Sequence, residues 1–318
     1  MTTISSSSEN DRRPRLKRVG AEQLPTLRLT ERDQAIIEAV YTCRALTAAQ
    51  IEALFFGSDE KPTAQHGRVN SRCLYRLQLL YQHGYLFRDE QAQKLSEGRK
   101  PLVYFLDTKG AELLAQLRAI PVRDLDWRPS HNDVKQPFLE HLLASNDVRV
   151  AFTTNAVSHD YHIVEWRDEL ALRRPQMKDL VTIKGPVGAQ ARVAVVPDGY
   201  CRLDAGSDIY NFFFEIDMRT VTGEASKWGK RDWARKVKVF LEYYRSGLYQ
   251  KRYQTADMRV LTITTGETRL ANLKRITEAA GGKARFWFTT FELVAQGDVL
   301  TKPIWWVASR KERHALLS

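Results

Sequence analysis

Two helix-start signals close together in the sequence constrain the first third of the chain most strongly. Thr30 and Thr47 are each followed three positions later by a side chain that can return the capping hydrogen bond, Asp33 and Gln50. Apolar residues follow at helical spacing: Ile36, Ile37 and Val40 after the first signal, and Ile51, Leu54 and Phe55 after the second. The short turn at 43–46 between the two predicted helices has the length used in helix-turn-helix units. We therefore predict a helix-turn-helix here.

The periodicity then changes from helical to strand-like. A third helix is predicted over residues 69–83, and two strands are predicted over 85–87 and 101–106, joined by a basic tip that contains glycine. A further helix follows over 108–117. Three helices, a hairpin and a closing helix in this order predict a winged helix-turn-helix domain over residues 27–119.

The third predicted helix is unusually basic. No acidic residue lies between Lys61 and Arg88, and arginine recurs every fourth position, which stacks the guanidinium groups on one helix face. Arginine can bind guanine and asparagine can bind adenine in the major groove. The predicted DNA contacts are Arg68, Asn70, Ser71, Arg72, Tyr75 and Arg76 on this helix, and Arg99 and Lys100 at the hairpin tip. The alternative is a solvated basic face on a helix that contacts protein.

The overall charge supports a polyanionic partner. The formal net charge is +11, and lysine or arginine that neutralises phosphate releases condensed counterions. A soluble basic protein with no such partner is the alternative. The three cysteines, Cys43, Cys73 and Cys201, share no C-x-x-C spacing and are predicted to be buried thiols in a reducing cytoplasm. Residues 1–26 are expected to form a disordered basic arm, and we expect neither a secretory signal nor a membrane span.

The remaining sequence predicts a linker and a second domain. Residues 120–134 are polar and punctuated by proline, and residues 135–318 alternate between helical and strand patterns. Helices are expected over 136–152, 226–245 and 268–280, and strands over 161–166, 193–196, 210–216, 259–264 and 284–288, with a last strand at Trp305 and Trp306.

Three carboxylates stand at the ends of predicted strands. Asp198 follows one apolar run, and Glu215 and Asp217 follow another. Strand alternation places Glu215 and Asp217 on one face, so the three can converge on a hard cation if the two strands pair. Oxygen ligands of this type suit Mg²⁺ or Mn²⁺, which would polarise a scissile phosphate. The alternative is that these acids are exposed and only balance the basic helix at 226–245.

With these motifs, the chain resembles the replication-relaxation family of plasmid and mobile-element proteins. That family is similar to the MOBC-type relaxases, in which a winged helix precedes a PD-(D/E)xK nuclease-like domain. The resemblance covers residues 28–260 and is carried by residues 72–84, 197–199 and 214–217. It implies an α/β core with a central mixed sheet, and a metal site at Asp198 and Glu215.

The same resemblance implies further site residues. Glu140 would be an additional acidic ligand, whereas Asp217 stands where the nuclease motif has its lysine. Three interpretations stay open: Lys236 replaces the missing lysine, Asp217 is another metal ligand, or the domain is an inactive fold retained for binding. The candidate catalytic set is therefore Asp198, Glu215, Asp217, Lys236 and Glu140, with Asp198, Glu215 and Asp217 as candidate metal ligands.

Taken together, the sequence predicts a cytoplasmic protein that binds double-stranded DNA and acts in the replication or mobilisation of a plasmid or mobile element. The nuclease-like domain would nick the bound site or hold it. The alternatives are a non-enzymatic regulator or relaxosome accessory protein, or a module that loads other replication proteins through a tryptophan-rich surface near Trp305. Homodimer formation is left open. The chain has no P-loop, and Tyr243 and Tyr244 have the spacing of packed residues rather than nucleophiles.

Overall fold

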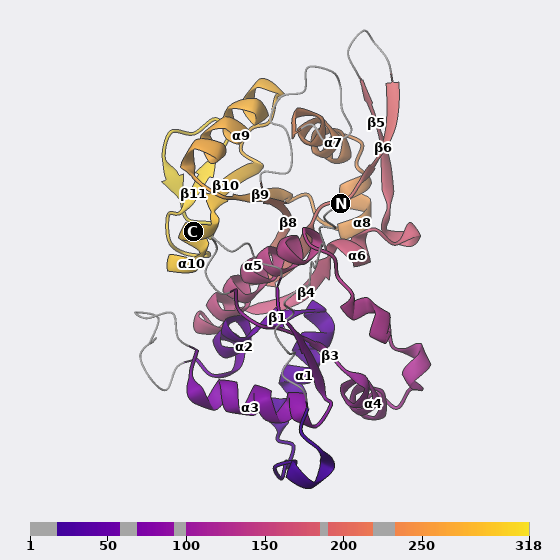
Figure 1. Ribbon diagram of the computed structural model, residues 1–318. Coiled ribbons are helices and arrows are strands. Elements are labelled where there is room, and N and C mark those ends of the chain that lie inside the picture. The colour runs from indigo at the N-terminus through magenta and orange to yellow at the C-terminus, as the bar shows by residue number, and fades with distance from the viewer. Residues whose placement is uncertain (1–17, 58–68, 92–99, 185–189, 219–232, 318) are drawn as a thin grey trace, which may run out of the picture. The chain divides into compact units, whose positions relative to one another are not determined.

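The computed structural model describes residues 18–57, 69–91, 100–184, 190–218 and 233–317. The chain divides between Val134 and Lys135 into two compact units, which are described separately (Figure 1). Arg68 and Arg99, both predicted DNA contacts, lie outside the described residues, as do residues 1–17 of the predicted arm and residues 226–232 of a predicted helix.

The described residues of the N-terminal unit form four α-helices and a small antiparallel sheet of order β1-β3-β2. Both predicted capping boxes form, at Thr30 and Thr47, and the apolar faces behind them meet in one core around Ile36, Ile51 and Leu77. The elements are α1 (Glu31–Cys43), β1 (Leu46–Thr47), α2 (Ala48–Phe55), α3 (Ser71–Gln82), β2 (Leu86–Asp89), β3 (Val103–Leu106) and α4 (Thr108–Leu117).

Two stretches that we expected to be unstructured pack onto this unit. The predicted linker contains two short 3-10 helices, η3 (Val122–Asp124) and η4 (Pro129–Asn132), and Leu125 is buried in the core. At the end of the predicted arm, a 3-10 turn η1 (Ala21–Gln23) follows Arg18, whose Nε donates to the backbone oxygen of Tyr81 at 2.8 Å. Composition alone missed these contacts because each stretch is held by a few side chains, such as Leu125 and Arg18, within a mostly polar sequence.

The C-terminal unit is built on a seven-stranded mixed sheet of order β12-β11-β10-β9-β8-β7-β4. The neighbours β8, β9 and β10 run parallel, and the other pairs are antiparallel. The mixed α+β class and the central mixed sheet are thus confirmed. The elements are α5 (Phe138–Ser158), β4 (His162–Asp168), α6 (Glu169–Leu172), η5 (Pro175–Met177), β5 (Asp179–Lys184), β6 (Gln190–Val195), β7 (Gly199–Asp204), β8 (Ile209–Asp217), α7 (Trp233–Arg245), α8 (Leu248–Tyr253), β9 (Arg259–Thr264), α9 (Glu267–Ala279), β10 (Phe286–Thr290), α10 (Phe291–Gln296), β11 (Trp305–Val307) and β12 (Arg313–His314).

Both faces of this sheet are covered. Phe212 and Phe214 of β8 pack into one apolar layer with α5 and α10, whereas Phe213 packs into a second layer with α7 and α9. This burial on two sides explains why the central strand is a continuous apolar run. Because side chains alternate along a strand, Glu215 and Asp217 share the face of Phe213, toward α7 and α9.

One strand pairing that the sequence left as a condition does not form. The strand predicted at 193–196 corresponds to β6, which ends at Val195 and pairs with β5 in a separate two-stranded sheet, not with the strand that carries Glu215. The antiparallel neighbour of β8 is instead β7, which was not predicted because polar residues interrupt it. Asp198 lies between β6 and β7 and still comes next to β8, as described below.

Candidate active site and nucleic-acid interface

Asp198 is fixed onto β8 by two backbone hydrogen bonds. Its own N–H donates to the oxygen of Phe214 at 3.0 Å, and its Oδ2 accepts from the N–H of Ile216 at 2.7 Å. These bonds flank Glu215, so the register of β7 against β8 brings the two carboxylates to the same end of the sheet. The predicted convergence of Asp198 and Glu215 therefore occurs through β7.

Lys236 reaches both carboxylates from α7. Its ammonium forms an ion pair with Glu215 Oε2 and lies 4.0 Å from Asp198 Oδ1. The Glu215 side chain is only 2% exposed, whereas those of Asp198 and Lys236 are 11% and 35% exposed. The cluster is therefore deeply set at Glu215 and open to solvent at Lys236.

The two carboxylates are held in different electrostatic states. Burial would raise the pKa of Asp198, but the Lys236 ammonium and His141 outweigh it and lower this pKa to about 2. Burial raises the pKa of Glu215 well above its usual 4.5; Lys236 opposes this shift and the Asp198 charge adds to it. Asp198 is therefore firmly ionised, and Glu215 resists ionisation unless more positive charge is present.

Glu215 also carries an unused ligand atom. Its Oε1 is buried and has no hydrogen-bond partner among the residues that the structure describes. Mg²⁺ is commonly bound through one or two protein carboxylates, with water and phosphate oxygens completing its shell. Within the described parts of the chain, no cluster of three or more acidic, histidine or cysteine side chains could hold a metal. Asp198 and Glu215 thus fit a sparse Mg²⁺ or Mn²⁺ site rather than a closed protein cage.

The helix α5 contributes His141 to this site. His141 Nε2 lies 3.6 Å from Asp198 Oδ2, and although burial would lower the pKa of His141, the contact with Asp198 raises it. Glu140 is half-buried one position earlier, and successive helix residues point about 100° apart because the helix has ~3.6 residues per turn. The sequence pattern placed the site near the start of this helix but did not include His141. Glu140 as an acidic ligand stays a prediction.

Asp217 belongs to a different group of contacts. Arg269 of α9 binds it with both edges, Nε to Oδ2 at 2.9 Å and Nη2 to Oδ1 at 3.0 Å, and the Thr264 hydroxyl donates to Oδ2 at 2.7 Å. Both carboxylate oxygens are therefore occupied by donors, unlike those of Glu215 two positions earlier. This geometry disfavours Asp217 as a ligand in the Asp198–Glu215 site.

In the N-terminal unit, α3 exposes a short surface at its N-terminal half. Ser71, Arg72 and Tyr75 are exposed, with Tyr75 at 62%. Asn70 caps the helix, because its Oδ1 accepts from the N–H of Arg72 at 2.8 Å. Lys100 lies half-buried before β3.

Arg76 does not share this surface, which corrects the expected row of stacked arginines. Its guanidinium binds the fully buried Asp33 through Nε at 2.6 Å and through Nη2, and Nη2 also donates to the backbone oxygen of Arg28 at 2.6 Å. Burial would raise the pKa of Asp33, but hydrogen bonds from Arg76 and Thr30 outweigh it and lower this pKa. Arg76 holds the core of the unit together and is not free to contact DNA.

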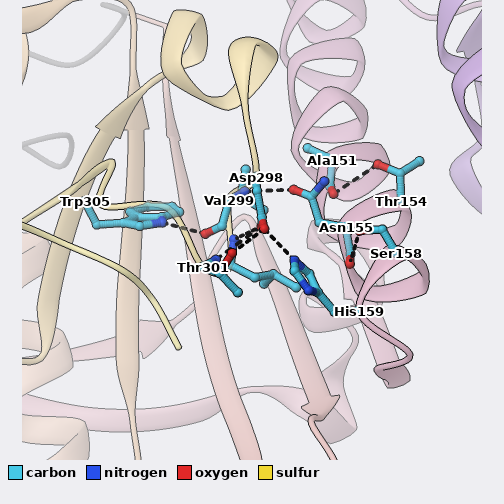
Figure 2. Close-up of polar contacts among 10 residues, drawn as sticks. Ala151, Thr154, Asn155, Ser158, His159, Asp298, Val299, Thr301 and Trp305 are labelled. Atoms are coloured by element: carbon cyan, nitrogen blue, oxygen red, sulfur yellow. Dashed lines mark hydrogen bonds and ion pairs between the residues drawn. The ribbon is translucent and has the colours of Figure 1, made fainter. Parts of the chain in front are cut away.

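Trp305 and Tyr243, two other residues considered from the sequence, both pack in the interior of the C-terminal unit. Asp298 accepts from His159 and from the backbone N–H groups of Leu300 and Thr301, and Trp305 donates to the oxygen of Val299 at 2.8 Å (Figure 2). Trp305 is fully buried and therefore belongs to the core, whereas its neighbour Trp306 is half-buried. Tyr243 is buried and donates to Asp179, as expected of a packed residue.

The comparisons with known proteins bear on the whole chain. The restriction endonuclease FokI superposes with a TM-score of 0.25 and 13% identity, over 86% of this chain and 46% of that one, a likeness too low to inform the fold. No curated protein matches the sequence. None of the described helices has the length and apolar character needed to cross a bilayer. The replication-relaxation family matches residues 37–258, which is more than half of the chain, and the chain belongs to that family.

Proposed function

We propose that this chain binds a specific site on duplex DNA and nicks it in a metal-dependent reaction during the replication or mobilisation of a plasmid or mobile element. The observation that carries the proposal is the Glu215 carboxylate, whose buried Oε1 lacks a hydrogen-bond partner among the described residues, beside Asp198 and Lys236. Membership of the replication-relaxation family supports a role in replication.

In this proposal the N-terminal unit is a winged helix. Its order of elements, with α3 followed by the β2–β3 hairpin and the sheet β1-β3-β2, supports that assignment. The helix α3 would enter the major groove with Ser71, Arg72 and Tyr75, which are exposed in its first turns together with Leu74. Arg68, Arg99 and Lys100 would contact flanking phosphates.

The C-terminal unit is proposed to be a nuclease of the PD-(D/E)xK type. Asp198 and Glu215 would hold Mg²⁺ or Mn²⁺, which polarises a phosphate and lowers the pKa of bound water. The N–H of Ile216 orients Asp198, and the low pKa of Asp198 keeps it ionised. Lys236 Nζ is the nearby cation that would neutralise charge developing on the phosphate, and so takes the place of the lysine that the motif has at position 217.

The proposal is tested by nicking of a supercoiled plasmid that carries DNA flanking the gene, with Mg²⁺ or Mn²⁺. We expect open-circular product, and a rate lower by roughly 10²- to 10⁴-fold in Asp198→Asn, Glu215→Gln and Lys236→Met. Glu312→Gln, at an exposed position, is the matched control and should nick at the wild-type rate. No product from the wild type, or undiminished product from the three site variants, would overturn the nicking activity. Site-specific binding without nicking would instead favour a regulator or accessory protein.

A further inference from the structure

The strands β5 and β6 form a hairpin arm that stands apart from the central sheet, beside α7 (Figure 1). They pair in continuous register from Asp179 opposite Val195 to Lys184 opposite Gln190. Exposure alternates strictly along β5, where Val181 and Ile183 are buried in the layer that contains α7. One face of the arm therefore packs onto the domain, and the other is left to solvent.

The solvent side, which we call the hairpin face, consists of Leu180, Thr182, Lys184, Gln190 and Arg192, all exposed. Thr182 lies opposite Arg192, and Lys184 lies opposite Gln190, so Lys184 and Arg192 are diagonal neighbours ~7–8 Å apart at their backbones. The two strands contain one acidic residue, Asp179, and it faces the other side. The hairpin face thus presents two cations and no carboxylate.

One end of the arm contacts α7, the helix that carries Lys236, and leads into Asp198. Asp179 accepts from the Tyr243 hydroxyl of α7 and binds Arg252 of α8 with both carboxylate oxygens. The helix α7 is also the one that carries Lys236. At the same end of the arm, β6 ends at Val195, opposite Asp179, and two residues lead directly to Asp198. This end of the arm is therefore connected to the Asp198–Glu215–Lys236 site through α7 and through residues 196–197.

We propose that the hairpin face binds the phosphate backbone of duplex DNA, in a contact that does not read sequence. Cationic side chains on an exposed, acid-free surface are the complement of phosphate, and such contacts position a duplex without specifying its bases. This inference rests on the proposed function, because it takes DNA as the ligand, and it deepens that function by adding a second contact that holds the duplex near the site.

The test measures binding of the full chain to a random-sequence duplex by fluorescence anisotropy between 50 and 200 mM KCl. The variant K184Q/R192Q is compared with R310Q/K311Q, which removes the same charge from exposed positions beyond β11. We expect K184Q/R192Q to bind roughly 10- to 100-fold more weakly at 100 mM salt. The slope of log affinity against log salt should fall by about 2, since each phosphate contact contributes ~0.9. The control should keep the wild-type slope.

The outcomes separate the hairpin contact from DNA binding itself. If the wild type binds DNA, Arg72→Ala weakens that binding, and K184Q/R192Q keeps the wild-type slope of log affinity against log salt, the hairpin contact is wrong and the proposed function stands. If the wild type shows no salt-dependent binding, both are wrong. Melting temperatures equal to that of the wild type would show that the variants are folded, as expected for substitutions at exposed positions.

Discussion

Each unit of the molecule buries a carboxylate against a basic side chain, and the two pairs differ in completeness. In the N-terminal unit, Asp33 Oδ1 accepts from Arg76, and Oδ2 accepts from Arg76 and from the N–H and hydroxyl of Thr30 at 2.6 and 2.7 Å. In the C-terminal unit, Glu215 is bound by Lys236 through one oxygen, and its other oxygen has no partner among the described residues.

This difference separates a structural ion pair from a candidate functional one. A buried polar atom without a partner costs free energy, and a ligand that completes it is one explanation for its retention. For Glu215 this explanation is favoured because Asp198 and Lys236 lie beside it. Asp217 sharpens the contrast within a single strand, because Arg269 and Thr264 occupy both of its oxygens. The chemistry is therefore expected at Glu215 and not at Asp33 or Asp217.

The largest expected effect on stability is that of breaking the complete pair. Asp33→Ala leaves Arg76 without its partner, and we expect the free energy of unfolding of the N-terminal unit to fall by about 3 kcal/mol, the lower end of the range for a buried pair. Urea unfolding followed by circular dichroism measures this loss. The matched control is Asp126→Ala, which removes the 3.2 Å exposed pair with Arg44 and should cost under ~1 kcal/mol. Equal losses in the two variants would contradict the assignment of Asp33 as a structural anchor.

The same pair predicts an acid dependence. The pKa of Asp33 is lowered from 3.8, so the stabilisation that it supplies is complete above pH 3.8 and is lost as the pH falls through the folded value. The difference in stability between wild type and Asp33→Ala should therefore be constant above about pH 5 and shrink below pH 3.8. A difference in stability between the wild type and Asp33→Ala that grows toward low pH would contradict the lowered pKa of Asp33.

A second prediction compares two arginines on one helix. Arg72 is exposed and Arg76 is enclosed by Asp33, so Arg72→Ala should weaken binding to the specific site by roughly 1–3 kcal/mol while leaving unfolding unchanged. Arg76→Ala should act in the opposite way, through loss of stability. Anisotropy and urea unfolding on both variants distinguish the two roles. An exchange of these effects would reverse our assignment of which arginine faces DNA.

At the incomplete pair, the expected effect on stability is smaller than at Asp33. Glu215→Gln should change the free energy of unfolding by less than about 1 kcal/mol near pH 5, because the wild-type carboxylate is itself poorly satisfied. The pKa of Glu215 is raised, so ionisation destabilises the fold as the pH rises above 4.5. The variant should therefore gain stability relative to wild type between pH 5 and pH 8 in the absence of divalent metal. A loss as large as that of Asp33→Ala would place Glu215 among the structural residues.

The local patterns were predictable from the sequence, and the long-range partners were not. Both capping boxes depend on residues three positions apart, and the alternation that aligns Glu215 with Asp217 follows from β8 alone. The partner of Arg76 is 43 positions away in the sequence. Nothing in the spacing separates Asp33, which is enclosed, from an ordinary capping acid.

The candidate site shows the same limit. Lys236 is one of two lysines on α7, and only the packing of α7 against the face of β8 distinguishes it from Lys238. His141 and Glu140 are adjacent in sequence, and the rotation of α5 places His141 beside Asp198. Of the β5–β6 hairpin, only part of β6 was predicted, as a strand at 193–196. The strand β5 was missed because its buried residues alternate with polar residues that also fit a loop.

The central claim is that Glu215 and Asp198 form an incomplete site that a divalent cation completes. The most direct measurement is the melting temperature of the full chain with and without Mn²⁺, because a ligand that binds the native state stabilises it by ~2.7 kcal/mol at a hundredfold excess over its dissociation constant. We predict a rise of a few degrees in the wild type and in Glu312→Gln, and none in Glu215→Gln or Asp198→Asn. No rise in the wild type, or the same rise in all four proteins, would contradict the account.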